Sequence, residues 1–193
     1  MIKSHKLEQG YFYHIYNRGN NSEVLFKEKD NYIYFLQLLR KYISPIADVY
    51  CYCLLNNHFH LLIRVKENQL GISEKNPGQM FSNFFNSYTK AFNKKYNRTG
   101  KLFEERFKRK KVEDEFYLTE LIYYIHANPQ NHGFIHDFRK YPYSSYKSLM
   151  SSKETNLKRE EVMEWYGGKD YFEAYHLIST RSLKKRKNSN YFN

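Results

Sequence analysis

The chain has little proline and little glycine, with four and eight of them among 193 residues. Such scarcity excludes a fibrous or a disordered chain. No apolar run approaches the roughly 20 residues of a membrane-spanning helix, and no secretory signal opens the sequence, so we expect no membrane partner. The only two cysteines, Cys51 and Cys53, lie too close together on one predicted strand to staple a fold. We therefore expect a reducing compartment, the cytoplasm.

Acidic residues are also few: 20 Asp and Glu stand against 32 Lys and Arg, which gives a formal net charge of +12. Aromatic residues are abundant, at 19% of the chain, and are numerous enough to fill a core. Cations neutralise phosphates and aromatic rings stack on exposed bases, so this composition favours a nucleic-acid partner. A solvated basic surface has the same composition, and charge alone does not exclude it.

Apolar periodicity predicts an element order of β-α-β-β-α-β-α. The fold class is therefore α+β, a ferredoxin-like, split βαβ antiparallel sheet with two helices on one face and an added third helix. Pro129 should end this third helix and push Asn128 out of helical geometry. The expected strands are 11–16, 49–55, 58–65 and one that follows a basic loop within 101–112, and the expected helices are about 30–43, 79–96 and 114–127. A domain over 1–149 would precede a small helical appendage over 150–180 and a basic tail over 181–193.

The segment His58-Phe59-His60 is the first candidate for chemistry. Residues i and i+2 of a strand point to the same face, so both imidazoles project together while Phe59 points into the core. Two histidines on the half-polar face of a strand can share a metal ion. A His-x-His pattern is weak by itself, and a purely structural role for the pair stays open.

Tyr124 and Asn128 are the second candidate, because their spacing of four places them on one flank of the added helix, together with Tyr117. This flank lies at the boundary of the apolar stripe, where a tyrosine ring is anchored and its hydroxyl stays free. Most boundary tyrosines only pack, and the chain has 20 tyrosines. His126, on the opposite flank, is interpreted as a surface or packing residue.

The third candidate is the basic stretch between residues 101 and 112, in which cations alternate with apolar residues. On a strand, alternate cations would line one face as phosphate contacts, although charge also protects edge strands from aggregation. The residues that we expect to bind DNA phosphates are Arg18, Lys101, Arg106, Lys108 and Lys110.

Four segments, in this order, resemble the signatures of single-tyrosine transposases of the His-hydrophobe-His class, and most closely those of the REP-associated branch. They are Cys53–Leu62 (CLLNNHFHLL), Gly100–Phe107 (GKLFEERF), Tyr124–Pro129 (YIHANP) and Tyr141–Tyr146 (YPYSSY). The likeness covers roughly residues 10–149. Two departures, Asn56 for a usual proline and Phe103 for a frequent tryptophan, remove no chemical group.

The resemblance implies a nuclease and strand transferase that acts on single-stranded DNA, often beside a hairpin. His58, His60 and Asn128 would hold Mg²⁺ or Mn²⁺, and Tyr124 would attack phosphorus, leaving a 5′-phosphotyrosine and a free 3′-hydroxyl. The oligomeric state stays open, with a monomer favoured because the REP-associated branch looks monomeric.

Two alternatives remain at this point. If Asn56-Asn57 forms a two-residue hairpin, Cys53 falls opposite His60 on one face, which would suit a zinc site, although buried cysteines are the preferred interpretation. The other alternative is a domesticated protein that holds DNA or RNA hairpins without cutting them. The basic and aromatic composition fits such a non-cutting binder equally well. The presence of all four residues of the resemblance, His58, His60, Tyr124 and Asn128, favours the nuclease.

Overall fold

A four-stranded antiparallel sheet is the centre of the computed structural model, which describes residues 6–67 and 76–183. The strand order is β2-β3-β1-β4, and each neighbouring pair is antiparallel. With the helices that connect and follow the strands, this confirms the predicted ferredoxin-like α+β plan. The strands are β1 (Phe12–Arg18), β2 (Ala47–Leu54), β3 (His58–Val65) and β4 (Lys108–Val112).

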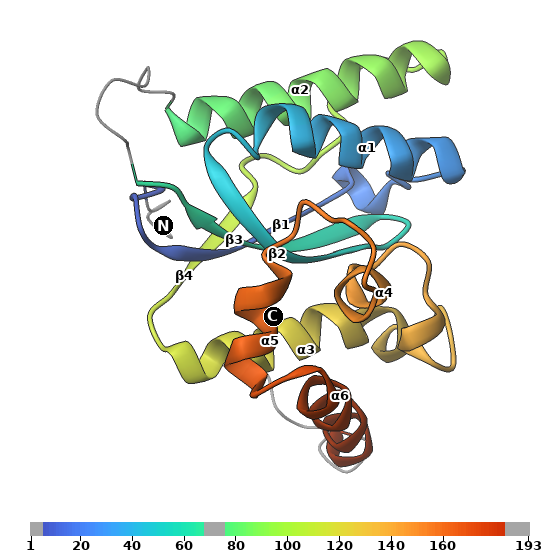
Figure 1. Cartoon of the computed structure of the whole chain (residues 1–193). Coiled ribbons are helices and arrows are strands. Elements are labelled where there is room, and N and C mark those ends of the chain that lie inside the picture. Colours follow the sequence, from blue (N-terminus) through green and yellow to red (C-terminus); the bar gives the residue numbers. More distant parts are fainter. Residues whose placement is uncertain (1–5, 68–75, 184–193) are drawn as a thin grey trace.

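Two helices, α1 (Lys29–Tyr42) and α2 (Pro77–Lys95), cover one face of the sheet (Figure 1). Helix α2 begins two residues before its predicted start, because Asn76 caps it and Pro77 occupies its first position, where proline is favoured. The aromatic stripe of α2 belongs to the core, as predicted. Its buried members are Phe81, Phe84, Phe85, Tyr88 and Phe92.

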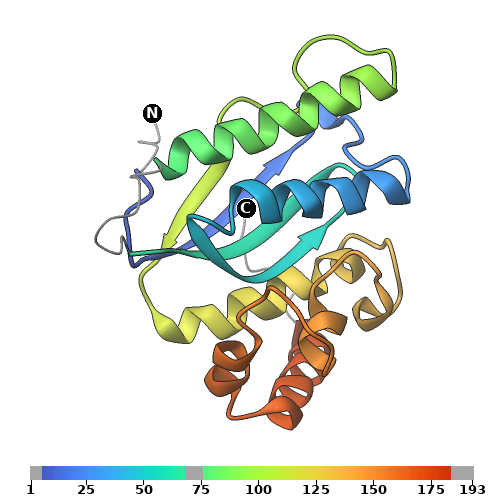
Figure 2. The ribbon, with the colours of Figure 1, turned by 45° about the horizontal axis from the view of Figure 1, so that its top comes forward.

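Helix α3 (Glu115–Asn131) lies against the opposite face of the sheet, below α1 and α2 in Figure 2. Its apolar stripe is buried, as its predicted docking requires; the members are Leu118, Leu121, Ile122 and Ile125. The prediction that Pro129 ends this helix is wrong, because α3 continues for two residues beyond it. Proline removes only one helical hydrogen bond so close to a terminus. Asn128 therefore stays helical, on the same flank as Tyr124.

Three further helices lie on the same side of the sheet as α3 (Figure 1): α4 (Tyr146–Met150), α5 (Arg159–Tyr166) and α6 (Lys169–Leu183), of which α5 and α6 fall within the predicted appendage. Helix α6 continues three residues past the predicted start of the basic tail, and residues 184–193 of that tail lie outside the described residues. Two short 3-10 turns complete the fold, η1 (Asn20–Ser22) and η2 (Phe138–Lys140). Among the described helices, none combines the length and the apolarity needed to cross a bilayer.

A buried chain of hydrogen bonds joins the appendage to α3 and to the sheet. His176 Nδ1 donates to the Phe172 carbonyl (2.8 Å), which leaves its Nε2 to accept from His126 Nδ1 (3.0 Å). His126 Nε2 then accepts from the hydroxyl of Ser145 (2.8 Å), and that oxygen accepts from the backbone N–H of Tyr52 (2.9 Å). Both imidazoles must be neutral for this order of donors. His126 is thus a packing residue and not a surface residue, since it is fully buried.

This chain of bonds makes the stability of the protein sensitive to acid. Burial lowers the pKa of His176 to about 4, and burial together with His176 holds that of His126 well below 6.5. Below pH 6.5 the unfolded chain takes up protons that the native state excludes, so the unfolding free energy should fall until the pH passes the folded value. His176 alone should contribute about 2 to 3 kcal/mol to this loss, measured by urea unfolding between about pH 7.5 and pH 4.5.

His176→Gln is the matched variant, because its side-chain oxygen can still accept from His126 while the titrating group is gone. We expect a smaller loss of stability on acidification than in the original chain, even where the variant starts from a lower value. An equal acid dependence in both proteins would show that His176 carries no part of the effect.

Candidate nuclease site

The predicted metal-binding face is formed where β3 pairs with β1. His58 lies opposite Arg18 in this register, and His60 lies opposite Tyr16. Tyr16 in turn pairs with Lys108 of β4. Because paired residues point to the same face, two imidazoles, a phenol and two cations share the face that α3 covers.

Helix α3 brings Tyr124 over this face. The Tyr124 ring meets the His60 ring edge to face, with centroids 5.6 Å apart, and is half-buried. The His58 and His60 rings are themselves perpendicular, with centroids 5.3 Å apart. Three of the four predicted active-site residues, His58, His60 and Tyr124, line a single open cavity of about 490 Å³. The rest of its wall is Tyr16, Asn17, Arg18, Asn57, Phe59, Glu104, Lys108, His132 and Phe134.

Asn128, the fourth predicted residue, lies fully buried beside this cavity. Its side-chain nitrogen reaches the backbone oxygen of Tyr124 at 3.5 Å, whereas its Oδ1 has no hydrogen-bond partner of normal geometry among the described residues. Burial has the larger effect on the pKa of His58, which it lowers, and on that of Tyr124, which it raises; a side-chain hydrogen bond with Asn128 opposes burial in each case, so the amide lies next to both groups. A buried amide oxygen without a donor is costly, and this one suits a cation.

Both histidines of the pattern are neutral at pH 7. Burial is the main cause that lowers the pKa of His58 to about 4, with a further contribution from His132. The pKa of His60 is also well below its usual value, first by burial and then by His14. His58 Nδ1 donates to Asn57 Oδ1 at 2.7 Å, which leaves the lone pair of Nε2 available. Together with Asn128 Oδ1, two neutral imidazoles form a donor set that fits a divalent cation.

His14 is a residue of the site that the sequence did not indicate. Its Nε2 lies 2.9 Å from Nδ1 of His60, and its ring is buried. Burial, and then the charge of Lys110, lowers the pKa of His14 to about 3, so the pair shares one proton in a neutral hydrogen bond. When His60 is the donor, its Nε2 keeps a lone pair and its ring is held in place. A hydrogen bond at the second ring nitrogen that orients a ligating imidazole is typical of metal sites, and here a second imidazole accepts it.

His132 is the second unexpected residue, at the end of α3. Its ring lies edge to face against His58, with centroids 5.1 Å apart, and it lines the same cavity. The sequence predicted that this helix ends at residue 127, so it gave no reason to place His132 near the site. His132 reaches His58 because α3 continues past Pro129.

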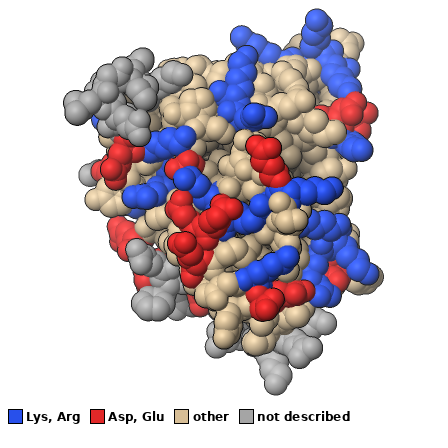
Figure 3. All heavy atoms as spheres, viewed as in Figure 1, with Lys and Arg blue, Asp and Glu red and all other residues tan. Residues whose placement is uncertain are grey.

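Four of the five predicted phosphate contacts line two separate hollows, and the fifth lines neither. Arg18 and Lys108 line the cavity of Tyr124, whereas Lys101 and Arg106 line a second hollow on the α2 side. Lys110 points toward α3, with its ammonium 5.3 Å from the centre of the Tyr117 ring. Lys and Arg side chains are also spread widely over the face in Figure 3, with Asp and Glu among them, so the basic charge is not confined to the site.

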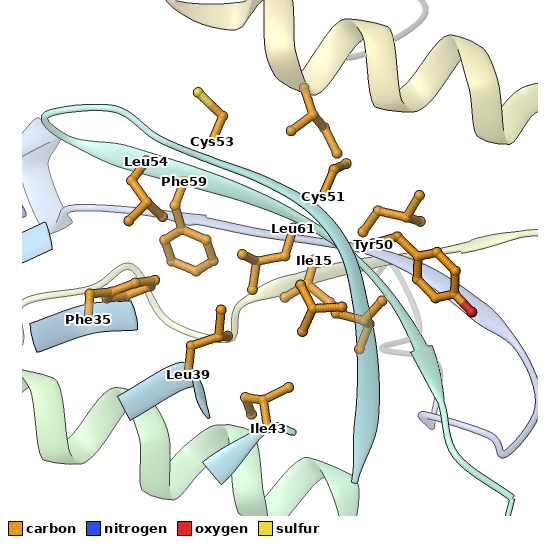
Figure 4. Packing of buried hydrophobic residues seen from close by; sticks show 14 of the residues in the cluster. Ile15, Phe35, Leu39, Ile43, Tyr50, Cys51, Cys53, Leu54, Phe59 and Leu61 are labelled. Atoms are coloured by element: carbon orange, nitrogen blue, oxygen red, sulfur yellow. The ribbon is translucent and has the colours of Figure 1, made fainter. Parts of the chain in front are cut away.

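The two cysteines behave as core residues. The Asn56-Asn57 hairpin places Cys53 opposite His60, as the zinc alternative requires. Both thiols point away from the apolar cluster around Phe59 (Figure 4), they are fully buried, and burial raises the pKa of each. Within the described residues, however, no group of three His, Cys, Asp or Glu side chains is placed to hold one ion, so this alternative lacks support.

No protein-family model matches the chain. A protein of Haemophilus influenzae assigned as a REP-associated tyrosine transposase is 29% identical over 121 residues, which are 60% of this chain and 64% of that protein's length. The solved structure of a REP-associated tyrosine transposase bound to a REP hairpin superposes with a TM-score of 0.63 at 14% identity, over 77% of this chain and 84% of the other. The resemblance to REP-associated tyrosine transposases that the four motifs predict is therefore confirmed, in sequence over part of the chain and in fold over most of it.

Proposed function

We propose that this protein is a transposase-like nuclease and strand transferase that cleaves single-stranded DNA beside hairpins through a covalent tyrosine intermediate. The observation that carries the proposal is the convergence of His58, His60 and Tyr124 on one cavity, with the orphaned oxygen of Asn128 beside it. Hairpin DNA is proposed as the partner because the structurally similar transposase was solved with a REP hairpin. The free thiols of Cys51 and Cys53 fit work in the cytoplasm.

His58, His60 and Asn128 would hold the cation, Mg²⁺ or Mn²⁺, because the phosphate and water supply the further oxygen ligands that these ions prefer. When bound, the cation would supply positive charge beside the scissile phosphate and the phenol. This help matters, since burial raises the pKa of Tyr124 above its ordinary value and keeps the hydroxyl protonated at neutral pH. His14 would hold the ring of His60 through their 2.9 Å hydrogen bond.

In the cleavage step, the hydroxyl oxygen of Tyr124 forms a bond to phosphorus and the bond from phosphorus to the 3′ oxygen breaks. The phenol loses its proton and the 3′ oxygen gains one, which leaves a 5′-phosphotyrosine and a free 3′-hydroxyl. The phosphodiester energy stays stored in the covalent link, so a different 3′-hydroxyl can reverse the step and join a new strand. Arg18 and Lys108, in the cavity wall, would hold the nonbridging phosphate oxygens.

The direct test is incubation of the protein with end-labelled single-stranded hairpins and Mn²⁺, followed by denaturing electrophoresis. The proposal expects a covalent protein–DNA adduct together with a free 3′-hydroxyl fragment. Binding without any adduct, with every hairpin and either metal ion, would instead favour the non-cutting hairpin binder.

The affinity for DNA should fall as the salt concentration rises, and the slope of this fall should report the number of phosphates that the protein neutralises. The logarithm of the affinity for single strands should fall with the logarithm of salt concentration by about 0.7 for each phosphate neutralised. Lys108→Gln should lower this slope by about one such unit, because Lys108 is exposed in the cavity wall. Lys153→Gln, an exposed lysine outside both hollows, is the matched control and should leave the slope unchanged. A flat salt dependence would count against phosphate contacts altogether.

A further inference from the structure

Tyr16 is a half-buried tyrosine in the wall of the cavity of Tyr124. It belongs to β1, which lies between β3 and β4 in the sheet. In this register Tyr16 stands opposite His60 on one side and opposite Lys108 on the other. Neighbouring strands are only about 4.8 Å apart, so the phenol lies between a proposed metal ligand and a cation.

The ring of Tyr16 is held in place by two imidazoles. Its centroid lies 4.7 Å from that of His14, with the two planes inclined by 32°. The centroid of His60 lies 5.7 Å away, with the planes inclined by 26°. Because these contacts fix the ring, they also fix the place of the hydroxyl oxygen.

The hydroxyl of Tyr16 forms no hydrogen bond with the described part of the chain. Other tyrosines of the core do form one. The hydroxyl of Tyr88 donates to the carbonyl of Leu25 at 2.6 Å. That of Tyr141 donates to the carbonyl of Leu54 at 2.8 Å. Since a tyrosine hydroxyl near a core normally has such a partner, the unused donor of Tyr16 indicates a role toward a ligand in the cavity.

The hydroxyl of Tyr16 is also a neighbour of the hydroxyl of Tyr124. Burial is the main cause that raises the pKa of Tyr124; a hydrogen bond with Asn128 opposes it, and Tyr16 raises that pKa further. Both tyrosine rings contact the ring of His60, Tyr16 by stacking and Tyr124 edge to face. A phosphorus atom bonded to the oxygen of Tyr124 would therefore bring its nonbridging oxygens toward Tyr16.

We propose that Tyr16 is a further catalytic residue, whose hydroxyl donates a hydrogen bond to a nonbridging oxygen of the scissile phosphate. A phenol, with an ordinary pKa of about 10, is protonated at neutral pH, so Tyr16 acts as a donor and transfers no proton. The nonbridging oxygens carry the charge of the transition state, and a donor that is already in place stabilises that charge. This inference rests on the proposed nuclease function and adds a residue to its mechanism.

Tyr16→Phe tests the inference, because phenylalanine keeps the stacking on both imidazoles and removes only the hydroxyl. With Mn²⁺ and saturating hairpin DNA, cleavage should slow by about 10²-fold, whereas KM should change by less than about threefold. The rise in melting temperature with Mn²⁺ should equal that of the original protein, because no proposed metal ligand is changed. Tyr11→Phe removes an exposed hydroxyl just before β1, and this matched control should cleave at the original rate.

A sulfur atom in place of one nonbridging oxygen distinguishes the proposed contact from a purely structural role. Sulfur is a weak hydrogen-bond acceptor. The original protein should cleave one of the two phosphorothioate diastereomers more slowly than the phosphate. This penalty should be smaller in Tyr16→Phe, which has no hydrogen bond to lose there, and any penalty for the other diastereomer should be equal in both proteins.

Cleavage by Tyr16→Phe at the original rate would overturn the inference, and so would equal sulfur penalties in the two proteins for both diastereomers. A lost response to Mn²⁺ would also overturn it, since the hydroxyl would then act through the cation site. An adduct that disappears in Tyr16→Phe and persists in Tyr124→Phe would make Tyr16 the nucleophile instead. These results leave the nuclease intact, whereas an original protein that forms no adduct with any hairpin would overturn the nuclease proposal and this inference together.

Discussion

Tyr124→Phe is expected to abolish the covalent adduct and DNA cleavage while the fold and the DNA affinity survive. Phenylalanine keeps the ring that packs edge to face on His60 and removes only the oxygen that we propose as the nucleophile. Cleavage should therefore fall by at least about 10³-fold, as expected when a covalent nucleophile is lost. Affinity should change little, because the ground-state contacts come from cations elsewhere in the wall. Denaturing gels measure the adduct, and anisotropy measures the affinity.

Tyr123→Phe is the matched control on the neighbouring residue. Its hydroxyl points to the appendage, where it donates to Thr180 Oγ1 at 3.4 Å, and its ring packs against His176. This variant should cleave like the original protein. An adduct that persists in Tyr124→Phe would move the nucleophile to another tyrosine, with Tyr117 on the same helix flank and Tyr16 in the cavity wall as the next variants to examine.

Local patterns were sufficient to predict the residues that share an element. Alternation along β3 placed His58 and His60 on one face, and a spacing of four placed Tyr124 and Asn128 on one helix flank. The two-residue turn at Asn56-Asn57 fixed the register of its own hairpin. Each of these inferences needs only the geometry of one element or of one tight turn, so short-range rules suffice.

Pairing between distant strands could not be predicted in this way. His14 reaches His60 because β1 pairs with β3 in one register, and a slip by one residue would turn His14 to the other face. His126 and His176 meet because the appendage packs on α3, which no local pattern specifies. The continuation of α3 through Pro129 is a similar case: packing outweighed a local rule and brought His132 to His58.

Asn128→Leu is expected to abolish metal binding without weakening the metal-free protein. Leucine is of similar size, and it removes a buried oxygen that has no donor among the described residues, so the melting temperature without metal should stay or rise. Mn²⁺ at 100 times its dissociation constant should stabilise the original protein by about 2.7 kcal/mol and the variant hardly at all. Cleavage in the variant should fall by about 10³-fold, or about 4 kcal/mol of transition-state stabilisation.

Asn131→Leu, at the exposed end of the same helix, is the control for this variant and should keep both the response to Mn²⁺ and the cleavage. His58→Ala should behave like Asn128→Leu, because its Nε2 is the proposed matching ligand, and it leaves the hydrogen bond between His14 and His60 intact. His60→Ala is less informative, since it also leaves a buried nitrogen of His14 without its hydrogen-bond partner and so lowers the stability of the fold by itself. If Mn²⁺ stabilised Asn128→Leu as much as the original protein, the amide would not be a metal ligand. The oxygen of Asn128 would then have to contact the bound DNA or the phenol of Tyr124 directly.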